Sequence, residues 1–170
     1  MEVTLSRDGF VAGVESILDP AYRLATVMLL DFAAAEDAVH DATLDAWARY
    51  RRTAGETTNF RTWFLAIVAT RCRRMRLRRR LPFGVRGEAP EASDLVSEVL
   101  LGLGTTARVA LFCRHWLGLS DEEVALILGI APNRVRDRIE QAEEHLHAEL
   151  EQDLGVTIVE SVDRGVDEQQ

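Results

Sequence analysis

The chain has 170 residues, of which 47% are hydrophobic, and a formal net charge of -8. This length and apolar content suffice for one domain or two small ones with packed cores. The sequence has no apolar stretch of about eighteen residues and no basic-then-apolar start typical of a signal peptide. It therefore predicts a cytoplasmic protein with no membrane span.

The two cysteines, Cys72 and Cys113, lie far apart in apolar helical patterns. Their spacing fits neither a disulfide framework nor a zinc site, so we interpret both as small core residues. His145 and His147 are two positions apart on a predicted helix and therefore lie on different faces. We expect no bound metal and no other cofactor.

The acidic charge is distributed unevenly. Residues 1–80 contain 13 arginines and 10 acidic residues, a charge of +3, whereas residues 81–170 contain 7 arginines and 18 acidic residues, a charge of -11. The net charge of the first part favours binding to a phosphate backbone, whereas that of the second part opposes it.

Helical periodicity dominates, and the sequence predicts an all-α fold of two small helical domains. The first helical stretch covers residues 8–30 and is expected to break at Pro20, with Asp19 capping a new helix. A second helix covers residues 34–52. Its predicted buried face recurs at helical spacing and consists of Val39, Ala42, Thr43, Ala46, Trp47 and Tyr50.

A third helix is predicted to begin near Phe60, after a polar loop, and to end in arginines. Its inward stripe is expected to hold Phe60, Phe64, Ile67, Val68 and Met75. Prolines and glycines then mark a linker over residues 81–93. The first predicted domain therefore spans residues 1–80.

The second predicted domain spans residues 94–152 and is followed by an acidic tail, residues 153–170. A short helix near residues 94–101 precedes one over residues 105–117, whose predicted buried face holds Val109, Phe112, Cys113 and Trp116.

A capping box formed by Ser120 and Glu123 opens the next predicted helix, which ends at Leu128 before a turn at Gly129. Pro132 begins the last helix, whose predicted inward residues are Val135, Ile139, Ala142, Leu146 and Leu150. Two helices joined through a glycine turn indicate a helix-turn-helix.

The last helix would present to DNA the exposed residues Asn133, Arg134, Arg136 and Arg138. The alternative is an ordinary helical hairpin whose polar face is solvated. The acidic residues further along the same helix would be repelled by the DNA backbone; these are Glu140, Glu143, Glu144 and Glu149.

Seven arginines between positions 71 and 80 create a strong positive field at the end of the third helix. Trp63 and Phe64 lie nearby, and an exposed aromatic beside a basic groove is what unpaired bases stack on. Alternatively, both aromatics belong to the core and the arginines interact with the helix dipole. The density of the run favours nucleic acid.

Asp37, Asp41 and Asp45 recur every four residues on the outer face of the second helix, beside His40 and Leu44. Like charges at this spacing repel one another by a few tenths of a kcal/mol. A basic partner would relieve this repulsion; a solvated polar face is the alternative.

These three features, in this order over residues 10–150, resemble the extracytoplasmic-function sigma factors. The segment AEDAVHDATLDAW, residues 35–47, is similar to the region-two helix of the family, which binds the beta-prime clamp of RNA polymerase. The segment FRTWFLAI, residues 60–67, is similar to the helix that follows it. Residues 119–150 are similar to the region-four helix-turn-helix that reads the minus-thirty-five element.

The resemblance implies three sets of site residues. The polymerase-binding set is Asp37, His40, Asp41 and Leu44. The set for the opened minus-ten element is Trp63, Thr70, Arg71, Arg73, Arg74 and Arg76. The minus-thirty-five set is Asn133, Arg134, Arg136 and Arg138.

The function implied is that of a sigma factor, which binds the beta-prime clamp and beta flap of core polymerase and directs promoter recognition and opening. Promoter DNA and an anti-sigma protein are the other expected partners. Such a protein is not an enzyme, and the sequence carries no glycine-rich phosphate loop or nucleophile motif.

Two departures from the family pattern leave an alternative open. Thr70 and Arg74 stand where the family has an asparagine and an aspartate, and Gln141, Glu143 and Glu144 stand where its recognition helix is basic. The alternative is a sigma-like regulatory protein that binds polymerase or another regulator without ordinary promoter recognition. A plain helix-turn-helix repressor would account only for the second half of the chain.

Overall fold

The computed structural model describes residues 7–52, 59–79 and 102–154. These ranges hold helices and no strand, which confirms the predicted all-α class. In chain order the elements are α1 (Arg7–Leu29), α2 (Phe32–Tyr50), α3 (Phe60–Arg79), α5 (Thr105–Leu111), the π-helix η1 (Phe112–Trp116), α6 (Asp121–Leu128) and α7 (Pro132–Leu154). No helix among the described residues is long and apolar enough to cross a membrane.

The predicted linker, residues 81–93, and the predicted short helix near residues 94–101 lie outside the described residues. The predicted tail begins at residue 153, but α7 continues to Leu154, and residues 155–170 are not described. The proposed domain boundaries therefore stay a prediction.

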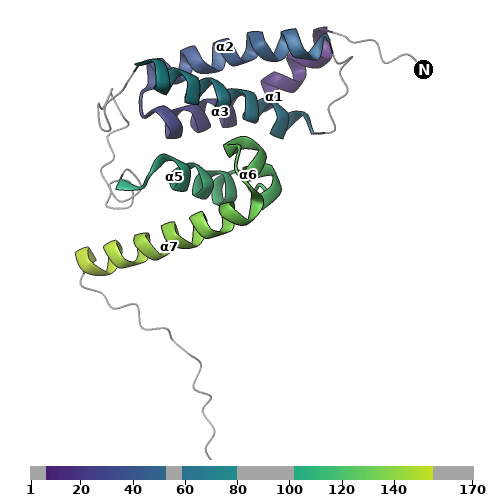
Figure 1. Ribbon diagram of the computed structural model, residues 1–170. Coiled ribbons are helices and arrows are strands. Elements are labelled where there is room, and N and C mark those ends of the chain that lie inside the picture. The colour runs from purple at the N-terminus through teal and green to yellow at the C-terminus, as the bar shows by residue number, and fades with distance from the viewer. Residues whose placement is uncertain (1–6, 53–58, 80–101, 155–170) are drawn as a thin grey trace, which may run out of the picture.

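The first helical group consists of α1, α2 and α3, each of which packs against the other two (Figure 1). Its fully buried core includes Leu24, Val39, Phe64, Leu65 and Val68. These positions follow the helical periodicity of the sequence, so burial of one apolar stripe per helix supplies the main stabilisation.

Aromatic rings close one end of this group. The ring of Phe10 lies 5.0 Å from Trp47, 5.3 Å from Tyr50 and 5.9 Å from Phe60. Gly13 permits this packing, because a Cβ there would lie only 2.8 Å from the Phe60 ring. The side chains of Trp47, Tyr50 and Phe60 therefore point inward as predicted, although all three are only half-buried.

The predicted break at Pro20 is wrong, because α1 runs unbroken from Arg7 to Leu29 with Pro20 inside it. An interior proline removes one backbone hydrogen bond. Residues on both sides of it, Ile17, Ala21 and Leu24, nevertheless continue a single buried stripe, and this packing overrides the local signal. Asp19 does not cap a second helix; its carboxylate accepts a hydrogen bond from Arg23 at 2.8 Å.

The second helical group consists of α5, η1, α6 and α7. The predicted capping box is present: the Ser120 hydroxyl accepts from the Glu123 backbone N–H at 3.3 Å, and the Glu123 carboxylate accepts from the Ser120 N–H at 3.0 Å. Gly129 follows α6 with a φ of 68°, the left-handed conformation that favours glycine. The structure thus contains the two helices, α6 and α7, and the glycine turn between them that the sequence predicted.

The expected burial of Trp116 is wrong, since its side chain is 66% exposed. The predicted α-helix over residues 105–117 changes at Phe112 into the π-helix η1, in which the Leu117 N–H donates to the Phe112 carbonyl at 3.2 Å. A turn widened by one residue shifts the following side chains around the helix axis. Val109 and Cys113 are therefore buried as predicted, whereas the Trp116 side chain is turned toward solvent.

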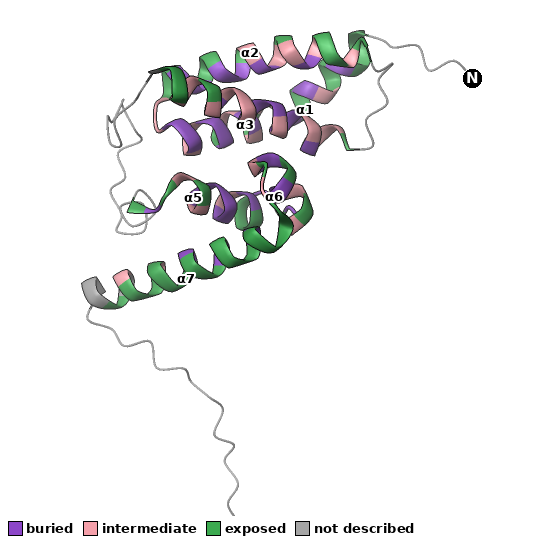
Figure 2. Cartoon of the chain, in the orientation of Figure 1, coloured by how far each residue is buried: buried purple, intermediate pink, exposed green. Residues whose placement is uncertain are grey.

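The two groups pack against each other, with α3 against α6 and α1 against α5 (Figure 1). Figure 2 shows that α7 is mainly exposed, whereas α5 and α6 bury more of their surface. Among the α7 residues whose burial is described, the buried ones are Val135, Ile139 and Ala142. The sheltered positions of Cys72 and Cys113 are confirmed, and burial raises the pKa of each thiol to about 12.

Candidate polymerase and nucleic-acid interfaces

The outer face of α2 presents the predicted polymerase-binding residues together. Asp37, His40 and Leu44 are exposed, and Asp41 is half-buried. Their spacing of three and four positions puts them on one side of the helix. Leu44 is 58% exposed, a large apolar side chain on the same face as Asp37 and Asp41.

This acidic face is partly neutralised from within the protein. An Arg71 guanidinium nitrogen lies 2.8 Å from a carboxylate oxygen of Asp45, and another lies 3.8 Å from Asp41. Arg71 comes from α3, which packs beside α2. A basic group of the same chain therefore relieves part of the repulsion along the aspartate stripe.

The arginines of α3 take different directions. Arg73 donates to the backbone carbonyls of Ile127 and Leu128, at 2.8 and 3.2 Å, and to the Thr70 hydroxyl at 3.0 Å. Arg76 donates to the Thr105 hydroxyl at 2.6 Å. Burial lowers the pKa of Arg73, although a guanidinium stays charged at neutral pH.

Arg74 is the exposed arginine among the six predicted minus-ten residues. Trp63 is half-buried, with its ring 5.4 Å from that of Phe60, so only part of it is accessible to a base. The Thr70 hydroxyl donates to the Ala66 carbonyl within the helix at 2.8 Å. Phe64 is fully buried and belongs to the core.

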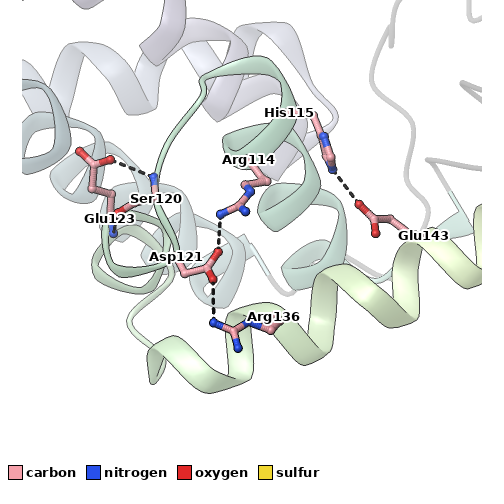
Figure 3. Close-up of polar contacts among 7 residues, drawn as sticks. All are labelled: Arg114, His115, Ser120, Asp121, Glu123, Arg136 and Glu143. Atoms are coloured by element: carbon pink, nitrogen blue, oxygen red, sulfur yellow. Dashed lines mark hydrogen bonds and ion pairs between the residues drawn. The ribbon is translucent and has the colours of Figure 1, made fainter.

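The start of α7 leaves the four predicted minus-thirty-five residues exposed: Asn133, Arg134, Arg136 and Arg138. Asp121, at the start of α6, lies between two arginines, 2.6 Å from Arg114 and 3.5 Å from Arg136 (Figure 3). This pairing fixes the start of α6 relative to η1 and α7.

Glu143, further along α7, has its carboxylate 2.8 Å from the His115 ring of η1 (Figure 3). Glu140 and Glu144 are exposed. The acidic residues of α7 thus follow its arginines directly, since Glu140 lies only two positions beyond Arg138.

Comparison with known proteins identifies the family. Residues 14–83 match the family model for sigma-70 region 2. The chain is 32% identical over 139 residues to the probable RNA polymerase sigma-C factor of Mycobacterium bovis, covering 74% of this chain and 75% of the relative. The same figures hold for the ECF RNA polymerase sigma factor SigC of Mycobacterium tuberculosis.

This chain belongs to the extracytoplasmic-function (ECF) sigma factors. As a sigma factor it directs transcription initiation.

Two solved structures have a similar fold. One is the sigma factor RpoE in complex with the anti-sigma factor NepR from Bartonella quintana, with a TM-score of 0.68 and 23% identity over 85% of this chain and 98% of that one. The other is CnrH in complex with the cytosolic domain of CnrY, with a TM-score of 0.70 and 23% identity over 87% of this chain and 91% of that one. At this identity the likeness shows the fold.

The contacts between the two helical groups of the sigma factor were not anticipated from its sequence. They involve Asn59, Arg61, Thr62, Arg108 and Glu123. The sequence did contain one signal for Arg108. It is a single arginine within the apolar run of α5, and a charged residue in a buried helix needs a polar partner. Glu123 was found only as a capping residue.

Arg108 is 8% exposed and joins the two groups. Its Nε donates to the Val27 carbonyl of α1 at 3.0 Å, and its Nη1 donates to the Leu103 carbonyl at 2.8 Å. Burial lowers its pKa, and the nearby Arg76 lowers it further. The carbonyl partners compensate for removing this charge from water.

Proposed function

We propose that this sigma factor binds core RNA polymerase through the outer face of α2. The observation that carries the proposal is Leu44, 58% exposed on the same side as Asp37 and His40. An exposed apolar side chain on the same face as acidic and polar ones suits a partner surface with a hydrophobic contact and a basic rim. Core polymerase, through its beta-prime clamp, is the partner that the family resemblance implies.

Promoter DNA is the second proposed partner. Arg71, Arg73, Arg74 and Arg76 of α3, with Trp63 and Thr70, would meet the unpaired minus-ten bases, because guanidinium groups and aromatic faces bind single strands. Asn133, Arg134, Arg136 and Arg138 at the start of α7 would meet the minus-thirty-five element, with the beta flap of polymerase holding this group in place. The protein would act by binding alone, without catalysis, in the cytoplasm where polymerase and promoters lie.

An anti-sigma protein is the third proposed partner, supported by the two similar sigma factors solved in complex with NepR and CnrY. The candidate contact is an apolar groove of about 560 Å³ that spans both helical groups. Its aromatic walls are Tyr22, Phe32, Phe112 and Trp116. Phe32 and Trp116 are 47% and 66% exposed, so an apolar segment of an anti-sigma factor would cover them.

The alternative, a sigma-like regulator without ordinary promoter recognition, is favoured by two observations. Arg71, Arg73 and Arg76 contact protein groups, and α7 carries exposed glutamates after its arginines. Transcription in vitro with purified core polymerase and genomic promoter fragments separates the two functions. Specific starts that require the protein support the sigma function, and core binding with no initiation supports the alternative.

The polymerase face is tested by Leu44→Ala, with Val11→Ala as the control. Both side chains are apolar and exposed, at 58% and 41%, but Val11 lies on α1, outside both proposed polymerase contacts. Leu44→Ala should weaken core binding about tenfold, the effect of losing roughly 1.4 kcal/mol at a partly buried interface position. Equal affinities of the two variants for core polymerase would exclude α2 as the binding face.

A further inference from the structure

Asp121 places one carboxylate between two arginines of the second helical group (Figure 3). Its Oδ1 lies 2.6 Å from a guanidinium nitrogen of Arg114 in η1, and its Oδ2 lies 3.5 Å from a guanidinium nitrogen of Arg136 in α7. Each carboxylate oxygen therefore serves a different arginine. The three side chains belong to three separate elements, so the fold of this group brings their charges together.

The aspartate of this cluster is sheltered, and the arginines are not. Only 16% of the Asp121 side chain is exposed, whereas 46% of Arg114 and 71% of Arg136 are exposed. Asp121 is also the first residue of α6, where the positive end of the helix dipole stabilises a negative charge. A ligand that arrives from solvent therefore meets the guanidinium groups before it meets the carboxylate.

The cluster borders the surface that the proposed function assigns to the minus-thirty-five element. Arg136 belongs to that set, together with the exposed Asn133, Arg134 and Arg138. In a helix-turn-helix the second helix enters the major groove while the first crosses the DNA backbone. A carboxylate at the start of the first helix, here α6, then lies on the side that faces phosphate oxygens, and like charges repel.

Asp121 reduces the positive charge that this surface offers to a phosphate. Its carboxylate offsets the charge of one of the two arginines that it contacts. A guanidinium N–H that donates to a carboxylate is also occupied when a phosphate oxygen approaches. Because affinity for any duplex rises with the number of phosphates that arginines neutralise, both effects weaken binding that is independent of sequence.

We propose that Asp121 limits the non-specific affinity of the second helical group for duplex DNA by pairing with Arg114 and Arg136. Binding then depends more on contacts to base edges, which carry the sequence information. This role rests on the proposed function, in which α7 binds the minus-thirty-five element. Asp121 is thus a residue that determines specificity without contacting a base.

The test uses the full chain with Asp121→Asn, which removes the charge and keeps the size of the side chain. Glu122→Gln is the matched control. It removes one negative charge at the next position of α6, close enough to both arginines to interact with them electrostatically. Both arginines nevertheless pair with Asp121 and neither pairs with Glu122.

Binding is measured by fluorescence anisotropy across a salt series, with two fluorescein-labelled DNA duplexes of unrelated sequence. Asp121→Asn should bind both duplexes about 3- to 10-fold more tightly and steepen the slope of log affinity against log salt by about one. Glu122→Gln should change the affinity by less than about twofold, because salt screens an exposed charge that has no direct partner.

A double variant shows whether the gain comes from a released arginine. Adding Arg136→Gln to Asp121→Asn should remove most of the gain, and Arg136→Gln should weaken binding more in this background than in the wild type. Tighter binding caused by unfolding of α6 would not depend on Arg136, and circular dichroism checks that the helices are intact.

The outcomes that overturn the proposal are distinct. Equal affinities of wild type and Asp121→Asn, with both proteins bound to DNA, overturn the role of Asp121 and leave the proposed function of α7 standing. Weaker binding by Asp121→Asn overturns it too, because the carboxylate would then position the arginines for DNA. An equal gain for Glu122→Gln overturns the direct pairing. If no form binds either duplex, the proposal fails together with the proposed DNA binding of α7.

Discussion

Arg71 of α3 lies 2.8 Å from the Asp45 carboxylate of α2, and this pair joins the two helices that carry the proposed polymerase and minus-ten faces. Both side chains are partly sheltered, with 24% and 33% of their surfaces exposed. The pair therefore fixes the spacing of α2 and α3 while Asp37 and His40 stay exposed for a partner.

A double-mutant cycle with Arg71→Gln and Asp45→Asn should give a coupling of about 0.5–1 kcal/mol in the free energy of unfolding, since a half-buried pair is only partly screened by water. Urea denaturation at low salt measures it. The more exposed Arg23–Asp19 pair of α1 is the control and should couple less. No coupling between Arg71 and Asp45 would mean that the contact makes no net contribution to stability.

The contact of Glu123 should depend on pH. Hydrogen bonds from Thr62, then from the Ser120 backbone and Asn59, with a smaller contribution from the nearby Arg61, hold its pKa below the ordinary value. A lowered folded-state pKa contributes stability above the unfolded pKa, and this is lost as pH falls through the folded value. At neutral pH the free energy of unfolding of the wild type should exceed that of Glu123→Gln by about 1 kcal/mol.

That difference should vanish in acid, below the ordinary glutamate range, when unfolding is followed as a function of pH. Glu122→Gln is the neighbouring control, because the Glu122 pKa is also lowered but mainly by its own backbone N–H, without a contact to α3. A difference between wild type and Glu123→Gln that persists unchanged at low pH would show that ionisation of Glu123 is not its source.

Arg108 should matter for stability more than any exposed arginine. Arg108→Met keeps the length of the side chain but leaves the Val27 and Leu103 carbonyls without this donor, which should lower the free energy of unfolding by about 2–3 kcal/mol. Thermal or urea unfolding measures the loss. Arg114→Met, at a 46% exposed position paired with Asp121, should cost less than about 1 kcal/mol. Equal losses would contradict a special role for the buried arginine.

The start of α7 should contribute to binding of double-stranded DNA through charge. Arg134→Ala should weaken binding to duplexes of different sequence to a similar extent and reduce the slope of log affinity against log salt by about one, if Arg134 contacts a phosphate. Fluorescence anisotropy across a salt series measures both. Arg23→Ala, at an exposed position of α1, should leave the slope unchanged; a slope insensitive to Arg134→Ala would exclude a phosphate contact there.

The two thiols should be unreactive in the folded protein. Burial raises the pKa of Cys72 and Cys113 to about 12, so very little thiolate forms at mildly alkaline pH. Labelling by a thiol reagent should be slow in buffer and rapid for both cysteines in denaturant. Fast labelling of the native chain would indicate that one cysteine becomes exposed by local opening.

The local elements followed from the sequence with few errors. Val39, Phe64 and Val135 recur at helical spacing and are buried, and Ser120 with Glu123 begins a helix as its side-chain chemistry dictates. The errors at Pro20 and Trp116 have different causes. A continuous buried stripe outweighed a local helix breaker in α1, and a widened turn in η1 changed the direction of a side chain that perfect periodicity would have buried.

The sequence by itself determined the helical class, the helix-turn-helix and the motifs of α2 and α3 that identify an ECF sigma factor, because these depend on residues close together in the chain. Only the tertiary structure decided where the arginines of α3 point. A guanidinium can bind a phosphate, a carboxylate or a backbone carbonyl, and the choice depends on which group lies within hydrogen-bond distance. For Arg73 that group is a carbonyl 54 positions away along the chain, so no local pattern could have predicted it.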